Sequence, residues 1–543
     1  MQIRRHLSMP GLLLGTLFFA LSLSPSLLPR GDLIQGVIAG LSLAVGYLLG
    51  VFLTWLWHYL ELPRPGRRLE YFLQGTAAVV AGLLALSFLF RASHWQNTVR
   101  ELMGMPPVDE VRALLVGAVA LAVFVISLLA GKLFRLALRL VSNALQRHVP
   151  RRLSNLAGVT VAFALFWLLI DGVLWASLLR SADSSYQQLD ALMDPEIERP
   201  QAALRAGSHA SLLDWEDMGL QGRQFLAATP ERTRIQEAVP GIARQPLRVY
   251  AGLNAAESPE KRAQLALQEL IRVGGFQRSL LLLVAPTGTG WIDPAAIETL
   301  EYLWQGDVAS VAAQYSYLPS PLSLMTEGAY GVETTRALFQ AVYNHWQRLP
   351  REERPRLYLF GLSLGALHSD QSFDFFDIID DPFDGVLWVG PPFSSPTWQR
   401  VTQRRQPDSP AWLPDFRDDS VVRFANQQGS LHQGEADWGD FRIAYLQYAS
   451  DPVTFFSPST LYREPAWLQP PRAPDVSPDL RWYPLVTMLQ LAADMGAGSA
   501  PTGYGHEYAA GDYIDAWEAL TDPPGWEQAE LRALKARMRA LHP

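Results

Sequence analysis

Residues 357–370 read LYLFGLSLGALHSD, in which a short apolar run ends at Gly361 and a turn of small residues carries Ser363. Gly361 to Gly365 fits the pattern G-x-S-x-G, the nucleophile elbow, in which a serine sits on a sharp turn between a strand and a helix. A serine hydroxyl is a weak nucleophile at neutral pH and needs an adjacent base. The pattern also occurs by chance, so the prediction depends on the apolar run before it and the helical segment after it.

A serine nucleophile of this kind needs a histidine base, and histidine is scarce after Ser363. His368 is too close to Ser363 within one predicted helix, and His542 is the penultimate residue. His432 lies in a polar stretch before the last predicted strand. His506 lies in the glycine-rich sequence GYGHEY, between that strand and the closing helix, where this arrangement places its base. We expect His506 to be the base; the alternative is an ordinary surface histidine.

The acid of such a triad lies between the serine and the histidine in the chain. Asp451 directly follows the predicted strand at 442–448. A carboxylate at that edge of a sheet can bind the far nitrogen of the histidine and fix its tautomer. The alternative is that Asp451-Pro452 only begins a turn. The other aspartates lie before a strand or in an insertion: Asp380, Asp381, Asp384, Asp418, Asp419, Asp437 and Asp440.

An oxyanion hole would use the backbone N–H of Leu364 and one N–H from the loop after an earlier strand. That loop reads PTGTGW at 286–291, so Thr287 and Gly288 are the candidates. Its glycines could also form a phosphate cradle, but no G-K-[ST] or G-x-x-G continuation follows. Because the chain has no cysteine and its histidines are dispersed, we expect neither a metal nor a cofactor.

Residues 246–543 alternate predicted strands and helices, which is typical of an α/β fold with a mostly parallel sheet. The runs SLLLLVA and GVLWV are continuously apolar, as expected for strands covered on both faces. The polar, proline-rich insertion at 392–440 is either a cap over the site or a surface excursion. Strands are expected at 246–251, 279–285, 308–315, 356–360, 385–389 and 442–448.

We expect residues 1–180 to form a membrane domain. Five stretches are long enough to cross a hydrocarbon core of ~30 Å at ~1.5 Å per helical residue. The first is expected to be retained, because it lacks the small-residue cleavage pattern of a signal peptide. Asp171, inside the last, is either a functional carboxylate or a group that water reaches from outside. The stretches are Pro10–Leu28, Leu33–Trp57, Tyr71–Phe90, Ala113–Ala130 and Leu156–Leu179.

Basic residues between these stretches predict the orientation, because the more basic side is cytoplasmic. Five crossings from a cytoplasmic N-terminus place everything after Arg180 at the outer face of a bacterial inner membrane. Residues 181–245 are expected to be a stalk. The basic side holds Arg4, Arg5, Arg64, Arg67, Arg68, Lys132, Arg135, Arg139, Arg147, Arg151 and Arg152, and the other side Arg30, Arg91, Arg100 and Arg112.

The composition limits other functions. At 543 residues the chain is long enough for at least two domains. Its formal charge of −8 gives no global footprint for nucleic acid. The absence of cysteine excludes disulfides and fits a reducing compartment or a bacterial periplasm.

The C-terminal part resembles a bacterial family of membrane-anchored alpha/beta-hydrolase proteins. The resemblance covers most of residues 205–525, and the apolar N-terminus is similar to that of the family. It implies an alpha/beta-hydrolase fold, although family members commonly carry Glu at the position of Leu362. The segments that carry it are VAPTGTGWIDPAAIETLEYL, QYSYLPS, LYLFGLSLG, LWVGPP, LQYASDPV and GYGHEY.

These features predict a membrane-anchored serine hydrolase, esterase- or lipase-like, with Ser363 as nucleophile, His506 as base and Asp451 as its orienting acid. The expected partners are the lipid bilayer and an acyl-ester or lipid-like substrate. An acyltransferase using the same triad remains open, as does a non-catalytic binding or envelope-assembly protein. The sequence leaves the oligomeric state open.

Overall fold

The computed structural model describes residues 7–63, 66–109, 112–145, 159–161, 163–164, 185–429, 431–432, 434 and 436–543. The chain forms two compact units, which we call the helical unit and the sheet unit. The helical unit comprises Met1–Arg180 and Phe456–Pro501, and the sheet unit comprises Ser181–Phe455 and Thr502–Pro543. The chain therefore leaves the sheet unit at Phe455 and returns to it at Thr502.

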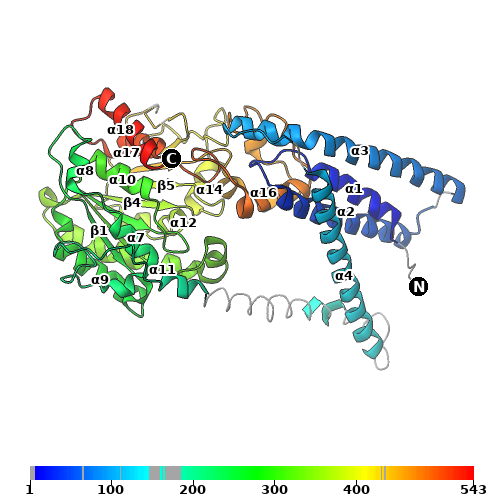
Figure 1. The fold of residues 1–543 in the computed structure, drawn as a ribbon, viewed down its shortest axis with the longest axis horizontal. Coiled ribbons are helices and arrows are strands. Elements are labelled where there is room, and N and C mark those ends of the chain that lie inside the picture. The colour runs from blue at the N-terminus through cyan, green and yellow to red at the C-terminus, as the bar shows by residue number, and fades with distance from the viewer. Residues whose placement is uncertain are drawn as a thin grey trace. The chain divides into compact units, whose positions relative to one another are not determined.

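Long apolar helices dominate the helical unit (Figure 1, blue to cyan). Among the described residues, three helices are long and apolar enough to cross a membrane: Asp32–Tyr59, Arg68–Leu102 and Ala113–Leu140. The elements of this unit are α1 (Met9–Ser22), α2 (Asp32–Tyr59), α3 (Arg67–Leu102), α4 (Ala113–Leu145), η6 (Pro458–Leu461), η7 (Ala466–Leu468) and α16 (Val486–Ala497).

The first expected crossing, Pro10–Leu28, is wrong in its extent. α1 ends at Ser22, so its 14 residues span only about 21 Å. Leu23, Leu27 and Leu28 are buried after the helix has ended. Most of the fifth expected stretch, including Asp171, lies outside the described residues and remains a prediction.

Glycines bring α2 close to two neighbouring helices. A Cβ added at Gly46 or Gly50 would lie 2.6 Å from backbone atoms of α1. A Cβ added at Gly40 would lie 2.6 Å from the carbonyl oxygen of Ala120 in α4, and Gly36 also faces α4. Each glycine pair is four residues apart, the spacing that lets transmembrane helices pack closely. α2 thus uses one pair of glycines for each neighbour.

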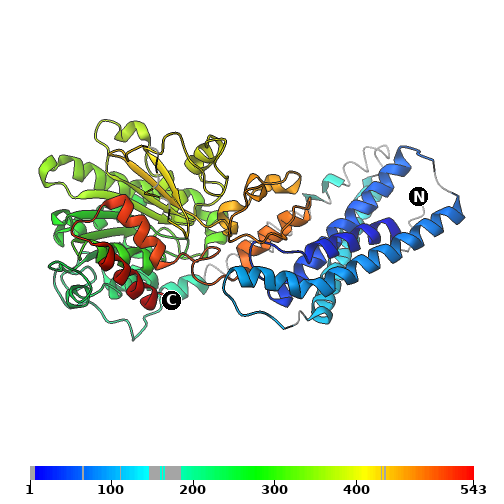
Figure 2. The same ribbon diagram turned by 90° about the horizontal axis from the view of Figure 1, so that it is seen from above.

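The sheet unit contains a parallel sheet of seven described strands, in the order β1-β3-β2-β4-β5-β7-β6. On one face of the sheet α11 packs against α9 and α12, and on the other face α10 packs against α17 (Figures 1 and 2). The strands are β1 (Leu247–Ala251), β2 (Leu280–Ala285), β3 (Val308–Ala313), β4 (Arg356–Leu362), β5 (Gly385–Val389), β6 (Val422–Ala425) and β7 (Arg442–Leu446).

The helices of this unit connect and cover the strands, which confirms the predicted α/β architecture. They are η2 (Trp215–Met218), α7 (Gly219–Ala227), α8 (Arg232–Gln236), η3 (Leu253–Ala255), α9 (Pro259–Arg272), η4 (Gly275–Gln277), α10 (Pro294–Leu303), α11 (Ser320–Arg348), η5 (Arg351–Glu353), α12 (Leu364–Asp370), α13 (Phe375–Ile378), α14 (Pro396–Gln403), α15 (Pro452–Phe455), α17 (Ala510–Thr521) and α18 (Gln528–Leu541).

The insertion at 392–440 is partly built into the sheet. It contributes the edge strand β6, which pairs in parallel with β7. Gln447, just after β7, accepts a hydrogen bond from the Trp398 indole N–H at 2.8 Å and donates one to the Trp412 carbonyl at 2.9 Å. The sequence analysis considered a separate cap or a surface excursion for this insertion. Neither alternative included a strand of the sheet.

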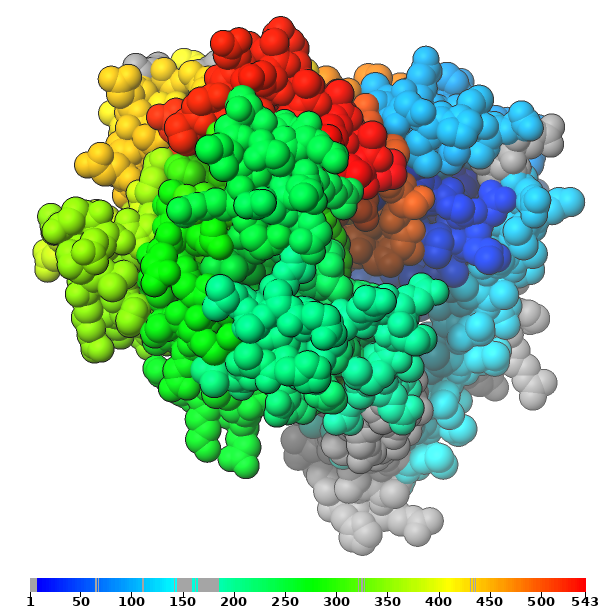
Figure 3. Space-filling model, turned by 60° about the vertical axis from the view of Figure 1, so that its left-hand side comes forward, coloured from blue at the N-terminus to red at the C-terminus, as the bar shows by residue number. Residues whose placement is uncertain are grey.

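The stalk expected at 181–245 is also corrected, because its described part is folded onto the sheet unit. The buried Arg223 guanidinium donates hydrogen bonds to the carbonyls of Asp190, at 3.0 Å, and Leu192, at 2.7 Å. A Cβ at Gly222 would lie 2.4 Å from the ring of Tyr250 in β1. Figure 3 shows the turquoise residues around position 200 lying against the green body of this unit.

The glycine contacts of α2 make a testable prediction. Gly40→Val should lower the stability of the helical unit by about 1–3 kcal/mol, because the added side chain overlaps the α4 backbone. The measurement is thermal unfolding of the detergent-solubilised protein. Gly82→Val in α3 is the control, since a Cβ there meets nothing within 4 Å. Equal unfolding temperatures for the two variants would contradict the packing.

Candidate active site

The sequence-predicted site residues follow strands that end at one edge of the sheet. In the ladder, Ala285 of β2 pairs with Gly361 of β4, and Leu362 pairs with Val389 of β5. Val389 in turn pairs with Leu446 of β7. The loop at 286–291, the turn at Ser363 and the segment with Asp451 therefore all leave from the carboxyl edge, where open α/β sheets bind ligands.

Ser363 occupies a strained turn between β4 and α12. Its φ of 55° and ψ of −124° are rare for a residue with a side chain. Its backbone N–H donates to the Val389 carbonyl at 2.9 Å. A Cβ at Gly361 would lie 2.3 Å from the backbone of Gly365, and one at Gly365 would lie 2.1 Å from the Ala285 carbonyl oxygen. Glycine is therefore required at both positions, because the neighbouring backbone lies too close for any side chain.

Asp451 and His506 are joined directly. His506 Nδ1 lies 2.7 Å from Asp451 Oδ2. The Asp451 side chain is fully buried, whereas that of His506 is 27% exposed. An ionised carboxylate oxygen can only accept a hydrogen bond, so Nδ1 must carry the hydrogen that it donates to Asp451 Oδ2. In a neutral histidine ring Nε2 then carries no hydrogen and can act as an acceptor.

Further groups hold this pair, and the sequence analysis missed them. The Tyr508 hydroxyl donates to Asp451 Oδ2 at 2.8 Å, and the Val453 N–H donates to Oδ1 at 2.8 Å. The Gly505 N–H donates to Ser450 Oγ at 2.9 Å, which ties the histidine loop to the residue before the acid. The only sequence signal was the position of Tyr508, two residues after His506 in GYGHEY.

Gly390, directly after β5, connects the serine turn with the histidine. A Cβ at Gly390 would lie 2.8 Å from His506 Cε1 and 3.0 Å from Asp451 Oδ2. The preceding residue, Val389, accepts the Ser363 N–H. His506 Nε2 is buried and makes no hydrogen bond within the described chain, so the structure contains no direct Ser363–His506 bond. Catalytic hydrogen bonds of this kind are often long or poorly aligned without substrate and tighten when it binds.

The charges around His506 set its protonation. Burial has the largest single effect and lowers the pKa of His506, but the charge and the hydrogen bond of Asp451, together with the charge of Glu507, outweigh it, so the net pKa lies above the ordinary 6.5. The neutral ring that can accept a proton is therefore the dominant form only at a pH above that raised pKa.

The oxyanion prediction is corrected at Thr287. Its backbone N–H donates to the Trp291 carbonyl at 2.9 Å, so it is already engaged within its own loop. The Gly288 N–H makes only a long contact of 3.4 Å with Ser320 Oγ. Leu364 is the first residue of α12, where an N–H has no carbonyl one helical turn earlier. Leu364 and Gly288 remain the predicted donors of the oxyanion hole.

The other histidines after Ser363 have separate environments. His368 is fully buried beside Tyr315, and burial lowers the pKa of His368 to about 4. His432 pairs with Glu518 at 2.6 Å, and His542 lies 3.2 Å from Glu298. Within the described chain no three His, Cys, Asp or Glu side chains form a group that could hold a metal.

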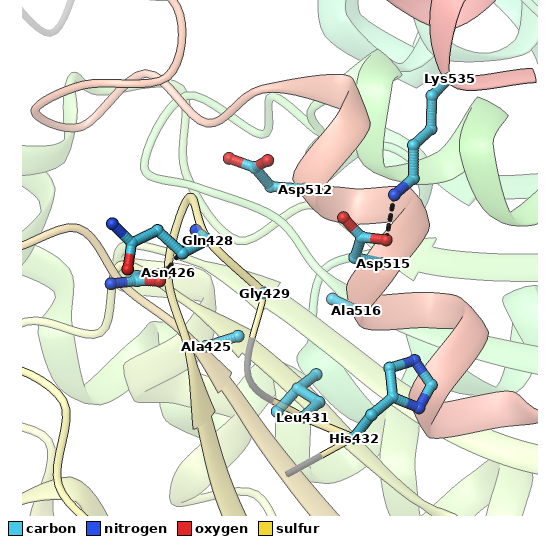
Figure 4. Close-up of a pocket in the computed structure, with 10 residues that line it drawn as sticks. All are labelled: Ala425, Asn426, Gln428, Gly429, Leu431, His432, Asp512, Asp515, Ala516 and Lys535. Carbon is cyan, nitrogen blue, oxygen red and sulfur yellow. Dashed lines mark hydrogen bonds and ion pairs between the residues drawn. The ribbon is translucent and has the colours of Figure 1, made fainter. Parts of the chain in front are cut away.

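A polar pocket of about 280 Å³ lies near the end of β6 (Figure 4). Burial raises the pKa of Asp512 in this pocket to about 6. Tyr448 donates to Asp512 at 2.5 Å and accepts the Ala509 N–H at 3.0 Å, so this pocket shares support with the histidine loop. None of the predicted triad lines it; the lining residues are Ala425, Asn426, Gln428, Gly429, Leu431, His432, Asp512, Asp515, Ala516 and Lys535.

A parallel sheet, a serine on a strained strand-to-helix turn and an Asp–His pair at the same edge define the alpha/beta-hydrolase class. The chain belongs to the alpha/beta-hydrolase family, because the model of one such family matches residues 247–534, more than half of its length. A model of the N-terminal region of the same family matches residues 23–230. No curated protein and no solved structure matches the chain.

The contact at Gly390 makes a prediction about the site. Gly390→Ala should displace the His506 ring and reduce labelling of the protein by a fluorophosphonate probe at least about tenfold, because small misplacements of reacting groups are costly. Gly429→Ala is the control: both glycines have positive φ (48° and 70°), but a Cβ at Gly429 meets nothing within 4 Å. An equal loss of labelling in both variants would show that backbone strain, and not contact with His506, is responsible.

Proposed function

We propose that the sheet unit is a serine hydrolase that cleaves acyl esters. The observation that carries the proposal is the 2.7 Å contact of His506 Nδ1 with the buried Asp451 carboxylate, at the edge where Ser363 occupies its strained turn. This pair leaves Nε2 as the acceptor nitrogen, which is the state required of a general base.

In this proposal Ser363 Oγ attacks the ester carbonyl carbon while its proton passes to His506 Nε2. The N–H groups of Leu364 and Gly288 stabilise the oxyanion. His506 then gives the proton to the departing alkoxide, which leaves as the alcohol. Water attacks the acyl-enzyme with His506 as base, releasing the acid and restoring Ser363. An alcohol in place of water would give acyl transfer.

The apolar helices support a substrate in or beside the bilayer. Three described helices can cross a membrane, and they are part of the same chain as the proposed site. Tethering a site to the surface that holds its substrate raises the effective substrate concentration without any new contact. Esters with long acyl chains are therefore the favoured substrate class.

The serine chemistry is tested by a fluorophosphonate probe and a soluble p-nitrophenyl ester. Ser363→Ala should abolish labelling and lower kcat by a factor on the order of 10⁶, as expected when the nucleophile is lost. Ser395→Ala is the control, because Ser395 is also buried and its hydroxyl makes no hydrogen bond within the described chain. Labelling that survives Ser363→Ala, or folded wild-type protein that never labels, would refute the proposal.

The location of the site at the outer face is also proposed, and the helical unit supports it. The backbone N–H of Arg30, between α1 and α2, donates to Gln96 near the end of α3 at 3.1 Å. Arg30 also pairs with Asp494 of α16 at 2.6 Å. These three segments therefore lie at one end of the helices, the end with few basic residues, which the positive-inside rule places outside.

Single cysteines can test this orientation, because the chain contains none. Ser499→Cys, exposed just after α16, should react with a membrane-impermeant maleimide in right-side-out vesicles. Gly66→Cys, exposed between α2 and α3, should react only after the vesicles are permeabilised. The reverse pattern would place the segment at Ser499, and with it the sheet unit, in the cytoplasm.

A further inference from the structure

The segment Phe456–Pro501 leaves and rejoins the sheet unit at the Asp–His pair. Asp451 precedes α15, and its backbone carbonyl accepts the N–H of Phe455, the last residue before the segment. At the other end, His506 follows Thr502 by four residues. The two ends are joined by the Gly505–Ser450 hydrogen bond and by the His506–Asp451 contact. The proposed acid and base thus each lie four residues from an attachment point of this segment, Phe455 or Thr502.

The same segment is built into the helical unit. α16 packs against α1 and α2 (Figures 1 and 2). Gln490 of α16 donates hydrogen bonds to the carbonyls of Ser22, at 3.2 Å, and Ser24, at 3.0 Å. The last carbonyls of a helix have no partner within it, and the Ser22 carbonyl at the end of α1 accepts hydrogen bonds from Gln490 of α16 and from Gln35 of α2, the latter at 2.9 Å.

A buried ion pair fixes α16 in place. Arg30 Nε donates to Asp494 Oδ1 at 2.6 Å, and the two side chains are 1% and 0% exposed. Asp494 Oδ2 accepts the Ser26 hydroxyl and the Leu27 N–H, the latter at 3.2 Å. Removing one partner from such a pair leaves an uncompensated buried charge and is strongly destabilising.

We propose that Arg30 and Asp494 are positioning residues for the Asp451–His506 pair. Through the covalent segment that begins after α15 and ends before His506, the helical unit restrains both members of the pair. Without this anchor, a long free loop would join the acid to the base, and closing such a loop costs conformational entropy. The predicted effect of this anchor on catalysis rests on the proposed serine-hydrolase function, whereas its predicted effect on the loop at 502–507 does not.

The experiment compares Asp494→Asn with Glu301→Gln in the full chain, reconstituted in lipid nanodiscs. Glu301 is matched because it also forms a buried pair, with Arg248 at 2.7 Å and with exposures of 1% and 0%, but within the sheet unit. The first readout is hydrogen exchange of residues 502–507, whose amides include the bonded Gly503, Gly505 and Glu507 N–H groups. Asp494→Asn should speed this exchange at least about tenfold; Glu301→Gln should leave it within about twofold.

The second readout is the pH profile of soluble-ester hydrolysis. kcat should fall about 10- to 100-fold in Asp494→Asn with KM nearly unchanged. In the wild type the rise of kcat/KM with pH should have its midpoint above 6.5, because Asp451 and Glu507 raise the pKa of His506 while Tyr508 donates to the same carboxylate. In Asp494→Asn that midpoint should move down towards 6.5 as the pair loosens.

Each outcome decides between the alternatives. Unchanged exchange and an unchanged midpoint in Asp494→Asn overturn the inference and leave the contact as an anchor only, as does equal loosening by Glu301→Gln. If Asp494→Asn does not fold, the same two measurements are made on Gln490→Ala, which removes only neutral hydrogen bonds, and their results are interpreted in the same way. Faster exchange in a protein whose wild type never labels supports the positioning role while refuting the hydrolase function.

Discussion

The geometry of the candidate site depends on one buried carboxylate. A buried charge is costly unless it is hydrogen-bonded, and Asp451 meets this requirement with partners from two sides. His506 and Tyr508 donate from the returning loop, and the Val453 N–H donates from α15. Each donor is held where it is by the cost of leaving Asp451 unpaired. The carboxylate therefore organises the loop that carries the histidine before any substrate is present.

The serine turn depends on the opposite kind of constraint, which is the lack of space. Ser363 holds a backbone conformation that costs about 1–3 kcal/mol, and such strain persists only when the surroundings determine it. The Val389 carbonyl fixes its N–H, and close backbone passes at Gly361 and Gly365 exclude side chains. Gly390 does the same beside His506. Much of the positioning at this edge therefore comes from residues without side chains.

Local patterns were sufficient for the parts of the structure that depend on short segments. Short apolar runs predicted six strands, and a five-residue motif placed Ser363 between a strand and a helix. Asp451 and His506 could be selected because strand ends converge at one edge and histidine is scarce. Thr287 could not be judged, because whether its N–H is free depends on the turn to Trp291, which composition does not reveal.

What the sequence missed depends on contacts between distant segments. β6 has only four residues in a polar insertion, so its strand character comes from pairing with β7 and not from its own pattern. The segment at 181–245 looks like a linker because the carbonyls that hold Arg223 carry no sequence signal. Likewise nothing local in α16 indicates that Asp494 would find Arg30, more than 400 residues earlier.

The division of the chain into two interleaved units has a consequence for how the protein can be taken apart. A fragment beginning at Ser181 would keep the whole sheet yet retain α16 without α1 and α2. Without α1 and α2, the apolar face of α16 that carries Asp494 would be exposed to solvent. Exposed apolar surfaces of this kind tend to associate. Deleting residues 456–501 as well would require a new link between Asp451 and His506, so the sheet unit has no single boundary at which it could be separated from the rest of the chain.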